Sequence, residues 1–470
     1  MAEDYRIDGK IIKRSMGICH ICNRIVEASV IEKEGALHFE KSCPEDGIFT
    51  VPHFLENSHY YKETERFYNR KSSLDSHSAV IVIDVTYKCD CECNFCYAQA
   101  NERKEADPTL EEIIRQVKDF KGHYVYLGGG EPTLREDIFL IIQTLKKMGF
   151  FVVLMTSGKK LVDLNFVKNL EKTGLDYIQL QFDTLDDAQY ISLMKEKMLD
   201  IKFKALDNIK KTSLPVYLWA RLVKGLNENQ IVPLVQFVAE NASRVKYLIL
   251  VDVWCEGRVA FKQGYVTREE MWDTLRINFG LTIDDFLDYM EFDYYLFDLY
   301  SFLKKERYLR RSTPCASRCH CFFISNKIVP LARIVDLKKI NGYLKKIVER
   351  IKSQRSRIKN LFFLVTHIPY FLIIREIIIN REIRRYIFRN IRFLFPRFFK
   401  RNPLNANENS FTLVIGPYMD RYNFDYKLCE YNCHMQVDLE GRLMPFCLKE
   451  ILRGKGIRDP LFVDGFKSVS

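Results

Sequence analysis

The sequence lacks the segments that take a chain into or across a membrane. Met1–Arg14 is mostly polar and charged, without the apolar core of a secretion signal. The apolar stretch Leu361–Ile374 falls short of the roughly 20 residues that span a bilayer, and Pro369 interrupts it. We therefore expect a cytoplasmic protein.

Excess positive charge is absent from most of the chain. The net charge is +11, but Lys338–Arg401, here called the basic segment, holds 18 Lys or Arg residues against three acidic ones, so the remainder sums to −4. Within it, Arg381–Lys400 mixes Ile, Phe and Arg at helical spacing. Such a helix suits peripheral contact with an anionic membrane at its inner face, which we favour. An ordinary solvated helix face is the second alternative, and nucleic acid is the least favoured.

Cysteine, in contrast, is plentiful and clustered. Fourteen cysteines in an intracellular chain do not predict disulfides, and their grouping predicts metal ligands. Only Cys91 and Cys255 fall outside four groups. The groups are Cys19, Cys22 and Cys43; Cys89, Cys93 and Cys96; Cys315, Cys319 and Cys321; and Cys429, Cys433 and Cys447.

The first group predicts a small amino-terminal metal module. Cys19 and Cys22 form a C-x2-C knuckle, a short β pattern (Ala28–Phe39) follows, and Cys43 comes next, as in half of a rubredoxin or zinc ribbon. We expect one iron or zinc ion here. The fourth ligand stays open between His20, Asp46 and a donor from elsewhere in the chain.

The second group lies in a loop directly after an apolar, β-branched run. Cys89, Cys93 and Cys96 have the spacing C-x3-C-x-Φ-C, in which Phe95 is the apolar residue. A four-iron cubane normally takes four thiolates, so a loop with three suggests one iron left open for a small ligand. A zinc site would more naturally show paired C-x2-C halves.

Glycine and polar residues follow the next predicted strands. The turn Gly128–Thr133 contains Gly129-Gly130-Glu131-Pro132, in which glycine lets the backbone approach a ligand and Glu131 can accept an ammonium group. Thr156-Ser157, Asp183 and Asn227 follow later strands. Each of these is predicted either to face the ligand or to serve as a turn or cap residue.

Strands and helices alternate through the centre of the chain. Repeated βα units predict a parallel sheet, here a six-stranded partial barrel, with its chemistry at the carboxyl ends of the strands. The predicted strands are Ala79–Val85, His123–Leu127, Phe150–Met155, Tyr177–Phe182, Val216–Val223 and Tyr247–Val251.

The last two cysteine groups predict auxiliary iron–sulfur clusters. A turn at Glu440-Gly441 predicts a hairpin that returns Cys447 toward Cys433. The six thiols could close one [4Fe-4S] cluster with two spare, or two clusters completed by other ligands. Some could equally be buried core cysteines.

Together these motifs resemble the radical S-adenosylmethionine (SAM) superfamily. Within it, the chain resembles the archaeal tetraether lipid synthases and the related pterin methylating enzymes of the methanopterin pathway. It departs from them at Asp46, where they usually have His, and at Leu448-Lys449-Glu450, where an Asn-containing continuation is usual. The resemblance rests on the Cys89 loop, Gly129–Pro132, Gln181–Asp183, Lys224–Asn227, Gly257-Arg258, Val329–Asp336, Tyr418–Asp425 and Gly441–Cys447.

The resemblance implies a [4Fe-4S] cluster on Cys89, Cys93 and Cys96 that reductively cleaves SAM to a 5′-deoxyadenosyl radical, with reduced ferredoxin or flavodoxin as electron donor. That radical would remove hydrogen from an unactivated C–H bond. The residues implied in SAM binding are Phe95, Gly129, Gly130, Glu131, Pro132, Thr156, Ser157 and Asp183.

The basic segment makes a lipid substrate the main expectation, with C–C bonds formed between isoprenoid chains in tetraether or macrocyclic lipids. Methylation of a pterin and modification of a peptide are the alternatives. A non-catalytic iron–sulfur carrier is disfavoured because it does not need Gly129–Pro132.

The predicted fold class is α/β, a partial (β/α)6 radical SAM barrel between an amino-terminal metal module and a carboxyl-terminal cysteine-rich region. The predicted units are 1–56, the rubredoxin- or zinc-ribbon-like module; 57–78, a connection; 79–310, the barrel; 311–337, a cysteine-rich auxiliary region; 338–410, the basic amphipathic segment; and 411–470, the second cysteine-rich auxiliary region.

Overall fold

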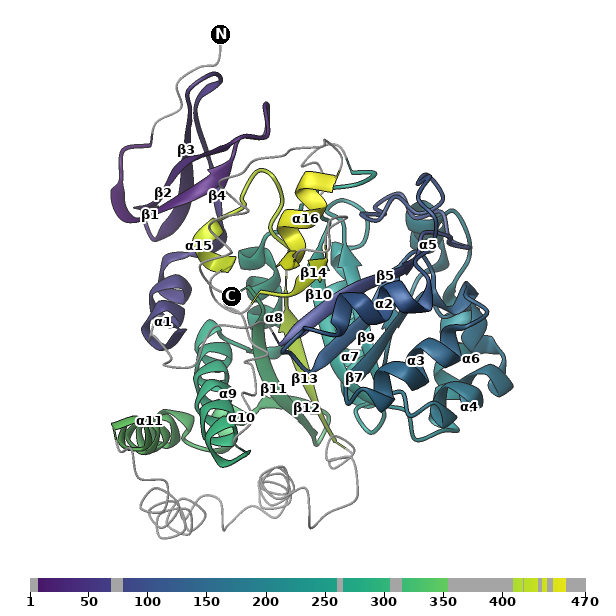
Figure 1. Cartoon of the computed structure of the whole chain (residues 1–470). Helices are drawn as coiled ribbons and strands as arrows, with labels where there is room; N and C mark the ends of the chain where they lie inside the picture. Colours follow the sequence, from purple (N-terminus) through teal and green to yellow (C-terminus); the bar gives the residue numbers. More distant parts are fainter. Residues whose placement is uncertain are drawn as a thin grey trace.

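Two β-sheets form the framework of the chain, a four-stranded sheet near the amino terminus and an 11-stranded sheet that forms the barrel (Figure 1). The structure is a computed structural model. It describes residues 7–68, 79–259, 265–304, 315–353, 409–416, 418–429, 433–437 and 443–453.

The amino-terminal sheet takes its strands in chain order, each antiparallel to the next. The strands are β1 (Lys10–Ile18), β2 (Ile25–Lys33), β3 (Ala36–Cys43) and β4 (Gly47–Asn57), and helix α1 (Ser58–Tyr68) follows them. Glu34 and Gly35, with φ of +52° and +81°, form the turn between β2 and β3. The β pattern at Ala28–Phe39 is therefore a hairpin.

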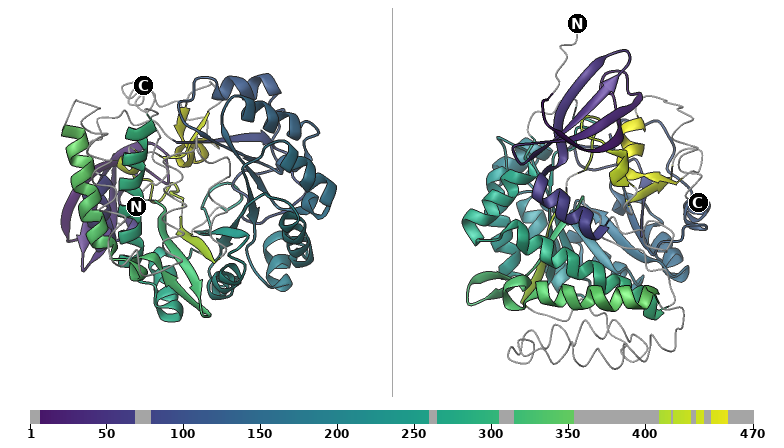
Figure 2. Two further views of the ribbon diagram at one scale, coloured as in Figure 1. Left: turned by 90° about the horizontal axis from the view of Figure 1, so that it is seen from below. Right: turned by 90° about the vertical axis from the view of Figure 1, so that its left-hand side faces the viewer.

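Six parallel strands make the barrel, and helices cover its outer face (Figure 2). The strands are β5 (Val80–Thr86), β6 (Tyr124–Gly129), β7 (Phe151–Thr156), β8 (Tyr177–Gln181), β9 (Val216–Leu222) and β10 (Val245–Asp252). The helices are α2 (Leu110–Val117), α3 (Ile138–Lys147), α4 (Leu164–Lys172), α5 (Asp187–Met194), α6 (Leu199–Lys210) and α7 (Ile231–Glu240). The predicted partial barrel is confirmed.

The carboxyl-terminal part extends this sheet at both edges, which the sequence did not predict. At one edge β13 (Ser410–Ile415) pairs parallel with β10, and β11 (Ser317–Ile324) and β12 (Lys327–Pro330) continue antiparallel. At the other edge β14 (Met435–Val437) pairs parallel with β5. The predicted hairpin consists of β14 and β15 (Leu443–Pro445), and it leads into α16 (Phe446–Arg453), which contains Cys447.

The amino-terminal module docks on a segment near the other end of the chain, just before α15 (Tyr426–Cys429). Lys41 is fully buried, and its Nζ donates to the backbone oxygens of Arg421 at 3.2 Å and Tyr422 at 2.9 Å. His53 Nε2 lies 3.1 Å from Asp425 Oδ2, and both side chains are buried. Breaking such buried polar contacts is costly, so they fix the module to the barrel.

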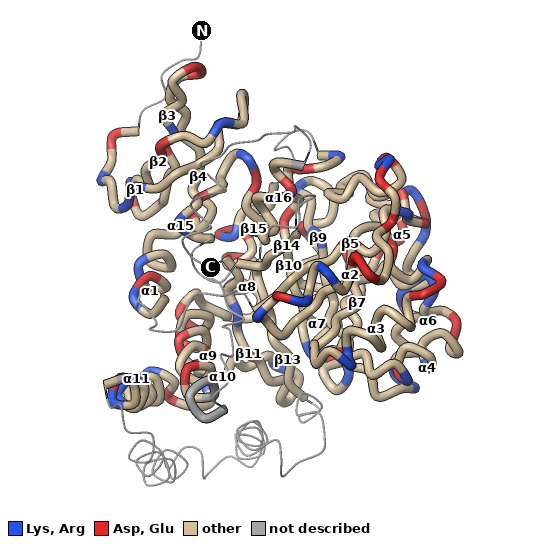
Figure 3. Tube along the Cα trace, viewed as in Figure 1, with Lys and Arg blue, Asp and Glu red and all other residues tan. Residues whose placement is uncertain are grey.

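Four helices cover the side of the molecule next to β11: α8 (Arg268–Phe279), α9 (Ile283–Lys304), α10 (Leu331–Ile334) and α11 (Leu337–Ser353). Helix α11 begins the basic segment. Its apolar face, with Ile340 and Leu344, packs against α9. Lys338, Lys339, Lys346 and Arg350 are exposed, and Figure 3 shows the basic positions of this helix in blue. This part of the basic segment is thus a solvated helix face over a core, and the rest, Arg381–Lys400 included, lies outside the described residues. In the described part of the chain, no helix is long and apolar enough to cross a membrane.

Candidate active site and metal centres

The cysteine loop leaves β5 at its carboxyl end, the edge where βα proteins place their chemistry. Phe95 is 7% exposed and packs against α5. The backbone N–H of Asn94 donates to the oxygen of Leu193 in α5 at 3.0 Å. Phe95, predicted to contact SAM, therefore anchors the loop, and half-buried thiols lie beside it: those of Cys89, Cys93 and Cys96.

The spacing of the thiols on this loop distinguishes a cluster from a single ion. Four thiolates at 2.3 Å from one zinc ion would lie about 3.8 Å apart. Cys89, Cys93 and Cys96 do not all lie within 4.8 Å of one another, whereas the ligand atoms of Cys89, Asp90 and Cys91 do. The wider spacing suits a four-iron cubane. Cys91, the extra cysteine of the sequence, is buried beside Cys89, and their hydrogen bond raises the pKa of the Cys89 thiol.

The glycine-rich turn is hydrogen-bonded to the backbone just before the cysteine loop. The N–H groups of Gly130 and Glu131 donate to the oxygens of Thr86 at 2.7 Å and Lys88 at 2.8 Å. Gly129 has φ of +103°, and a Cβ there would lie 2.4 Å from Thr86 O. A Cβ on Gly130 would lie 2.1 Å from Lys88 O. Glycine is required at both positions because the two backbones touch.

Gly257 and Arg258 hold the same loop from the opposite side. Arg258 N donates to Cys96 O at 3.1 Å, its Nη1 to Cys93 O at 2.9 Å and its Nη2 to Ala100 O at 2.8 Å. Gly257 has φ of +68°, and a Cβ there would lie 2.4 Å from Cys96 O. A rigid guanidinium fork therefore fixes the loop that carries the predicted ligands.

The Glu131 carboxylate is hydrogen-bonded to two of the other predicted SAM-binding residues, Thr156 and Ser157. The side chain is 2% exposed. Its Oε1 accepts from the hydroxyls of Thr133 at 2.6 Å and Thr156 at 2.7 Å, and its Oε2 accepts from Ser157 N at 2.7 Å. Oε2 has one protein donor, and a carboxylate offers about four acceptor positions in all. Glu131 is therefore held rigidly and can still accept an ammonium group.

Asp183 and Asn227 serve mainly the local structure. Asp183 is fully buried, and its oxygens accept from Arg221 N at 2.7 Å and Gln181 Nε2 at 2.7 Å. Burial raises the pKa of its carboxyl group. Asn227 Nδ2 donates to the backbone oxygens of Asp183 and Arg221. Asn227 is therefore a turn residue, the second of the two alternatives predicted for it.

Lys202 lies in this site, although it was not predicted there. It is fully buried in α6, and its Nζ donates to Ser157 O at 2.5 Å. Burial lowers the pKa of its ammonium group, while the nearby Asp183 carboxylate opposes this shift. The sequence held one signal, because Lys202 stands on the same helix face as the apolar Leu206 and Ile209. A lysine on an apolar stripe usually has a buried partner.

The amino-terminal module forms a compact four-ligand group. The ligand atoms of Cys19, Cys22, Cys43 and Asp46 all lie within 4.8 Å of one another. The Cys22 and Cys43 sulfurs are 3.6 Å apart, close to the spacing expected around one tetrahedral ion. Burial raises the pKa of the Cys22 thiol to about 12. His20 instead packs on Phe49, with ring centroids 4.7 Å apart, so the structure favours Asp46 as the fourth ligand.

The six auxiliary candidates separate into two sets. The hydrogen bond to Cys433 raises the pKa of the Cys429 thiol, and nearby Cys447 and Cys315 raise it further. Burial raises the pKa of the Cys447 thiol, and nearby Cys433 and Cys315 add to this. No three of these four come within 4.8 Å of one another, the looser spacing that suits a cluster. Cys319 and Cys321 lie elsewhere, on one face of β11 with sulfurs 3.7 Å apart.

Two segments of the chain match known protein families. Residues 83–238 match the radical SAM superfamily, and residues 11–53 match the HMPTM N-terminal zinc ribbon domain. Residues 83–238 form a radical SAM domain. The chain is therefore an enzyme that uses SAM with a [4Fe-4S] cluster, as the cysteine loop predicted.

Related proteins match this radical SAM enzyme to different extents. The 7,8-dihydro-6-hydroxymethylpterin dimethyltransferase of Methanocaldococcus jannaschii is 26% identical over 95% of each chain. The probable GTP 3′,8-cyclase of Pyrococcus abyssi is 30% identical over 36% of this chain and 56% of its own. The crystal structure of Streptococcus suis SuiB bound to S-adenosylmethionine is 22% identical, with a TM-score of 0.37, over 47% of this chain and 50% of that one. The enzyme thus spans only about half the length of the latter two.

These relatives bear on the substrate expected from the sequence. The relative that matches the radical SAM enzyme from end to end is a pterin dimethyltransferase, which favours the pterin alternative over coupling of lipid chains. Neither the described part of the fold nor the relatives named above support lipid synthesis or membrane contact.

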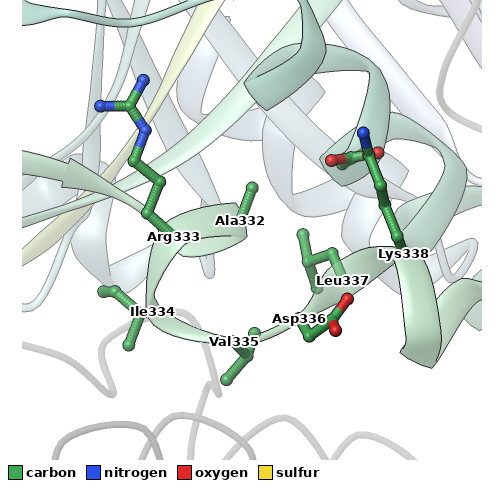
Figure 4. Close-up of a pocket in the computed structure, with 8 residues that line it drawn as sticks. Ala332, Arg333, Ile334, Val335, Asp336, Leu337 and Lys338 are labelled. Carbon is green, nitrogen blue, oxygen red and sulfur yellow. The ribbon is translucent and has the colours of Figure 1, made fainter.

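A surface hollow of the enzyme lies away from these centres (Figure 4). It is lined by Ala332–Lys338 and Asp288, where α10 and α11 meet α9. The lining contains no cysteine and none of the predicted SAM-binding residues, so we assign the hollow no part in the chemistry.

The fourth ligand of the zinc ribbon is testable by substitution. We expect Asp46→Ala to weaken zinc binding at least about 10-fold, because a lost ligand costs no less than a lost second-shell partner. Competition with a chromophoric chelator measures this affinity. His20→Ala is the matched control and should bind zinc like the unaltered chain; the reverse ranking of the two variants would assign His20 as the ligand.

Proposed function

We propose that this radical SAM enzyme methylates a pterin or a closely related soluble N-heterocycle. The observation that carries the proposal is the extent of the match to the pterin dimethyltransferase, which covers 95% of both chains. A match of that extent includes the zinc ribbon and the carboxyl-terminal strands as well as the shared barrel. The match to the GTP cyclase covers 36% of the chain and carries less information about the substrate.

We propose that Cys89, Cys93 and Cys96 hold the [4Fe-4S] cluster, which together with SAM supplies a 5′-deoxyadenosyl radical able to abstract hydrogen. The enzyme's own residues orient the reactants. Glu131, fixed by Thr156 and Ser157, would receive the ammonium group of SAM. Buried side chains along the inner face of the barrel would exclude water from the reaction.

Two further metal centres are proposed, an auxiliary cluster and an ion site in the amino-terminal module. We propose that Cys315, Cys429, Cys433 and Cys447 hold one auxiliary iron–sulfur cluster, and that Cys19, Cys22, Cys43 and Asp46 hold one zinc or iron ion. Cys319 and Cys321 would then be core residues of β11. Reduced ferredoxin or flavodoxin stays the proposed electron donor.

Coupling of isoprenoid chains is the competing function, and its support is the resemblance to the tetraether lipid synthases together with the charge of the basic segment. In the described α11, that charge lies on a solvated helix face over a core. We therefore treat lipid coupling as the alternative result that the assay below can detect.

An anaerobic assay tests the proposed function. The metal-reconstituted enzyme is incubated with SAM, dithionite, 7,8-dihydro-6-hydroxymethylpterin and a source of the transferred carbon, which is excess SAM in one arm and a methylenetetrahydropterin in another. Isoprenoid ether lipids replace the pterin in a parallel incubation, and the products are analysed by mass spectrometry. We expect 5′-deoxyadenosine and a pterin heavier by one or more methyl groups, both absent with Cys93→Ala. An unchanged pterin beside a coupled lipid would replace the pterin proposal by the lipid one.

A further inference from the structure

The inner face of the barrel can be followed across the sheet from its strand pairing. Side chains of directly paired residues in a parallel sheet lie on the same face. Gln436 in β14 pairs with Val82, Val82 with Tyr126, and Tyr126 with Val153. Val153 forms an apolar cluster with Tyr177 and Tyr217, whereas its neighbours in β7, Val152 and Leu154, pack in the main core with the outer helices. Gln436 therefore faces the interior of the barrel.

Gln436 is a buried amide with unused bonding capacity. The residue is 1% exposed, and neither its Oε1 nor its Nε2 has a hydrogen-bond partner within the described ranges. A buried polar group is normally hydrogen-bonded, because an unpaired one has lost water without a replacement. An amide of this kind on the inner face of an enzyme barrel indicates a polar ligand that completes its bonds.

Carboxylates lie on the same side. Asp84 is 6% exposed and stands two residues after Val82, so it shares the inner face of β5. Lys449 Nζ, from α16, lies 3.8 Å from Asp84 Oδ2. Glu450 is 4% exposed and stands one helical turn after Phe446, so both side chains point to the same side of α16.

Aromatic rings complete this part of the interior. Tyr126 stacks on His434, two residues before Gln436, with ring centroids 6.1 Å apart. The Phe446 ring packs against the rings of Tyr418 and Trp254, with ring centroids 5.4 Å apart in each pair. Flat apolar walls beside a few convergent polar groups are typical of sites for planar heterocycles.

We propose that Gln436 recognises the lactam edge of the substrate, with Oε1 accepting from a ring N–H and Nε2 donating to the adjacent ring carbonyl. Asp84 and Glu450 accept from the amino group next to that edge. A pterin ring presents these donors and acceptors in one plane, so the inference rests on the proposed function and names the side chains that select the substrate.

A hydrocarbon occupant would have the opposite requirement. An isoprenoid chain offers no hydrogen bond, so it would leave the Gln436 amide buried and unpaired. Replacing the amide by an apolar side chain of similar length should then strengthen binding of such a chain. The same substitution should weaken binding of a pterin, so one variant separates the two classes.

Equilibrium dialysis of the anaerobic, metal-loaded full chain tests the inference with two probes, 7,8-dihydro-6-hydroxymethylpterin and a phytanyl alcohol. We expect Gln436→Met to raise the pterin Kd roughly 10-fold or more, the loss of one or two hydrogen bonds. Gln436→Glu keeps the shape but loses the Nε2 donor, and should also weaken binding. Gln236→Met in α7, which removes an amide bonded to Glu240 at the surface, is the matched control.

The outcomes separate the inference from the proposed function. Pterin binding that is equally tight in the unaltered chain and in both Gln436 variants would overturn the inference and leave the proposed function in place. No pterin binding by the unaltered chain, with phytanyl binding that tightens in Gln436→Met, would overturn both. The iron content and the thermal midpoint of each variant show whether it has folded. If Gln436→Met has not folded, the pterin Kd of Gln436→Glu tests the inference in its place.

Discussion

Replacing Gly130 by alanine should empty the cysteine loop of iron although no ligand is removed. The added Cβ would lie 2.1 Å from the oxygen and 2.8 Å from the carbonyl carbon of Lys88, the residue before Cys89. Backbone on both sides makes the contact rigid, so the loop must move. A shift of about 1 Å at a catalytic group can cost about 100-fold in rate. We expect a loss of at least that size in 5′-deoxyadenosine formation.

Electron paramagnetic resonance with and without SAM measures the site directly, because only the SAM-binding cluster should change its signal. Gly342→Ala is the matched control, since Gly342 lies in α11 with nothing within 4 Å of an added Cβ. That variant should behave like the unaltered enzyme. A Gly130→Ala enzyme with a normal SAM-dependent signal would show that the turn does not position the loop.

Cys433→Ala should remove about four iron atoms per chain, the content of one auxiliary cluster, and leave the SAM-dependent signal in place. The reason is that Cys433 is hydrogen-bonded to Cys429 and lies near Cys447, and both Cys429 and Cys447 also lie near Cys315. A three-thiol remainder has no protein ligand for the fourth iron. Iron analysis of the reconstituted protein measures the loss.

Cys321→Ala provides the comparison. Cys321 is fully buried on β11 beside Cys319, away from the other four thiols. We expect this variant to keep its full iron content and to lose only stability, through the smaller side chain. If Cys321→Ala lost as much iron as Cys433→Ala, all six cysteines would again be candidate cluster ligands.

Local patterns were sufficient for the barrel and for the cysteine loop. The β-branched run at Ala79–Val85 and the apolar runs after it predicted each barrel strand to within a few residues, because a buried parallel strand is apolar on both faces. The C-x3-C-x-Φ-C spacing and the Gly129–Pro132 turn are likewise contiguous in the sequence. Their tertiary contact follows from adjacent strands, β5 and β6.

Contacts between distant segments could not be predicted in the same way. The pairing of β14 with β5 joins residues more than 350 positions apart, so the burial of Gln436 had no local signal. The division of the six auxiliary cysteines also depends on tertiary contacts, because Cys315, Cys429, Cys433 and Cys447 come from separate segments while Cys319 and Cys321 share β11. For Asp46, the usual spacing of zinc-ribbon ligands favoured no particular donor, and only the folded module shows its carboxylate beside Cys19 and Cys43.

The contact between Lys41 and the backbone of Arg421 and Tyr422 sets an order for maturation during synthesis. The ribbon leaves the ribosome early, and its own four ligands lie within Cys19–Asp46, so it can take up its ion while translation continues. Its docking surface is made some 380 residues later. Until that segment has been made, the ribbon has no surface to dock on, and the β5 edge of the barrel sheet lacks its partner strand β14.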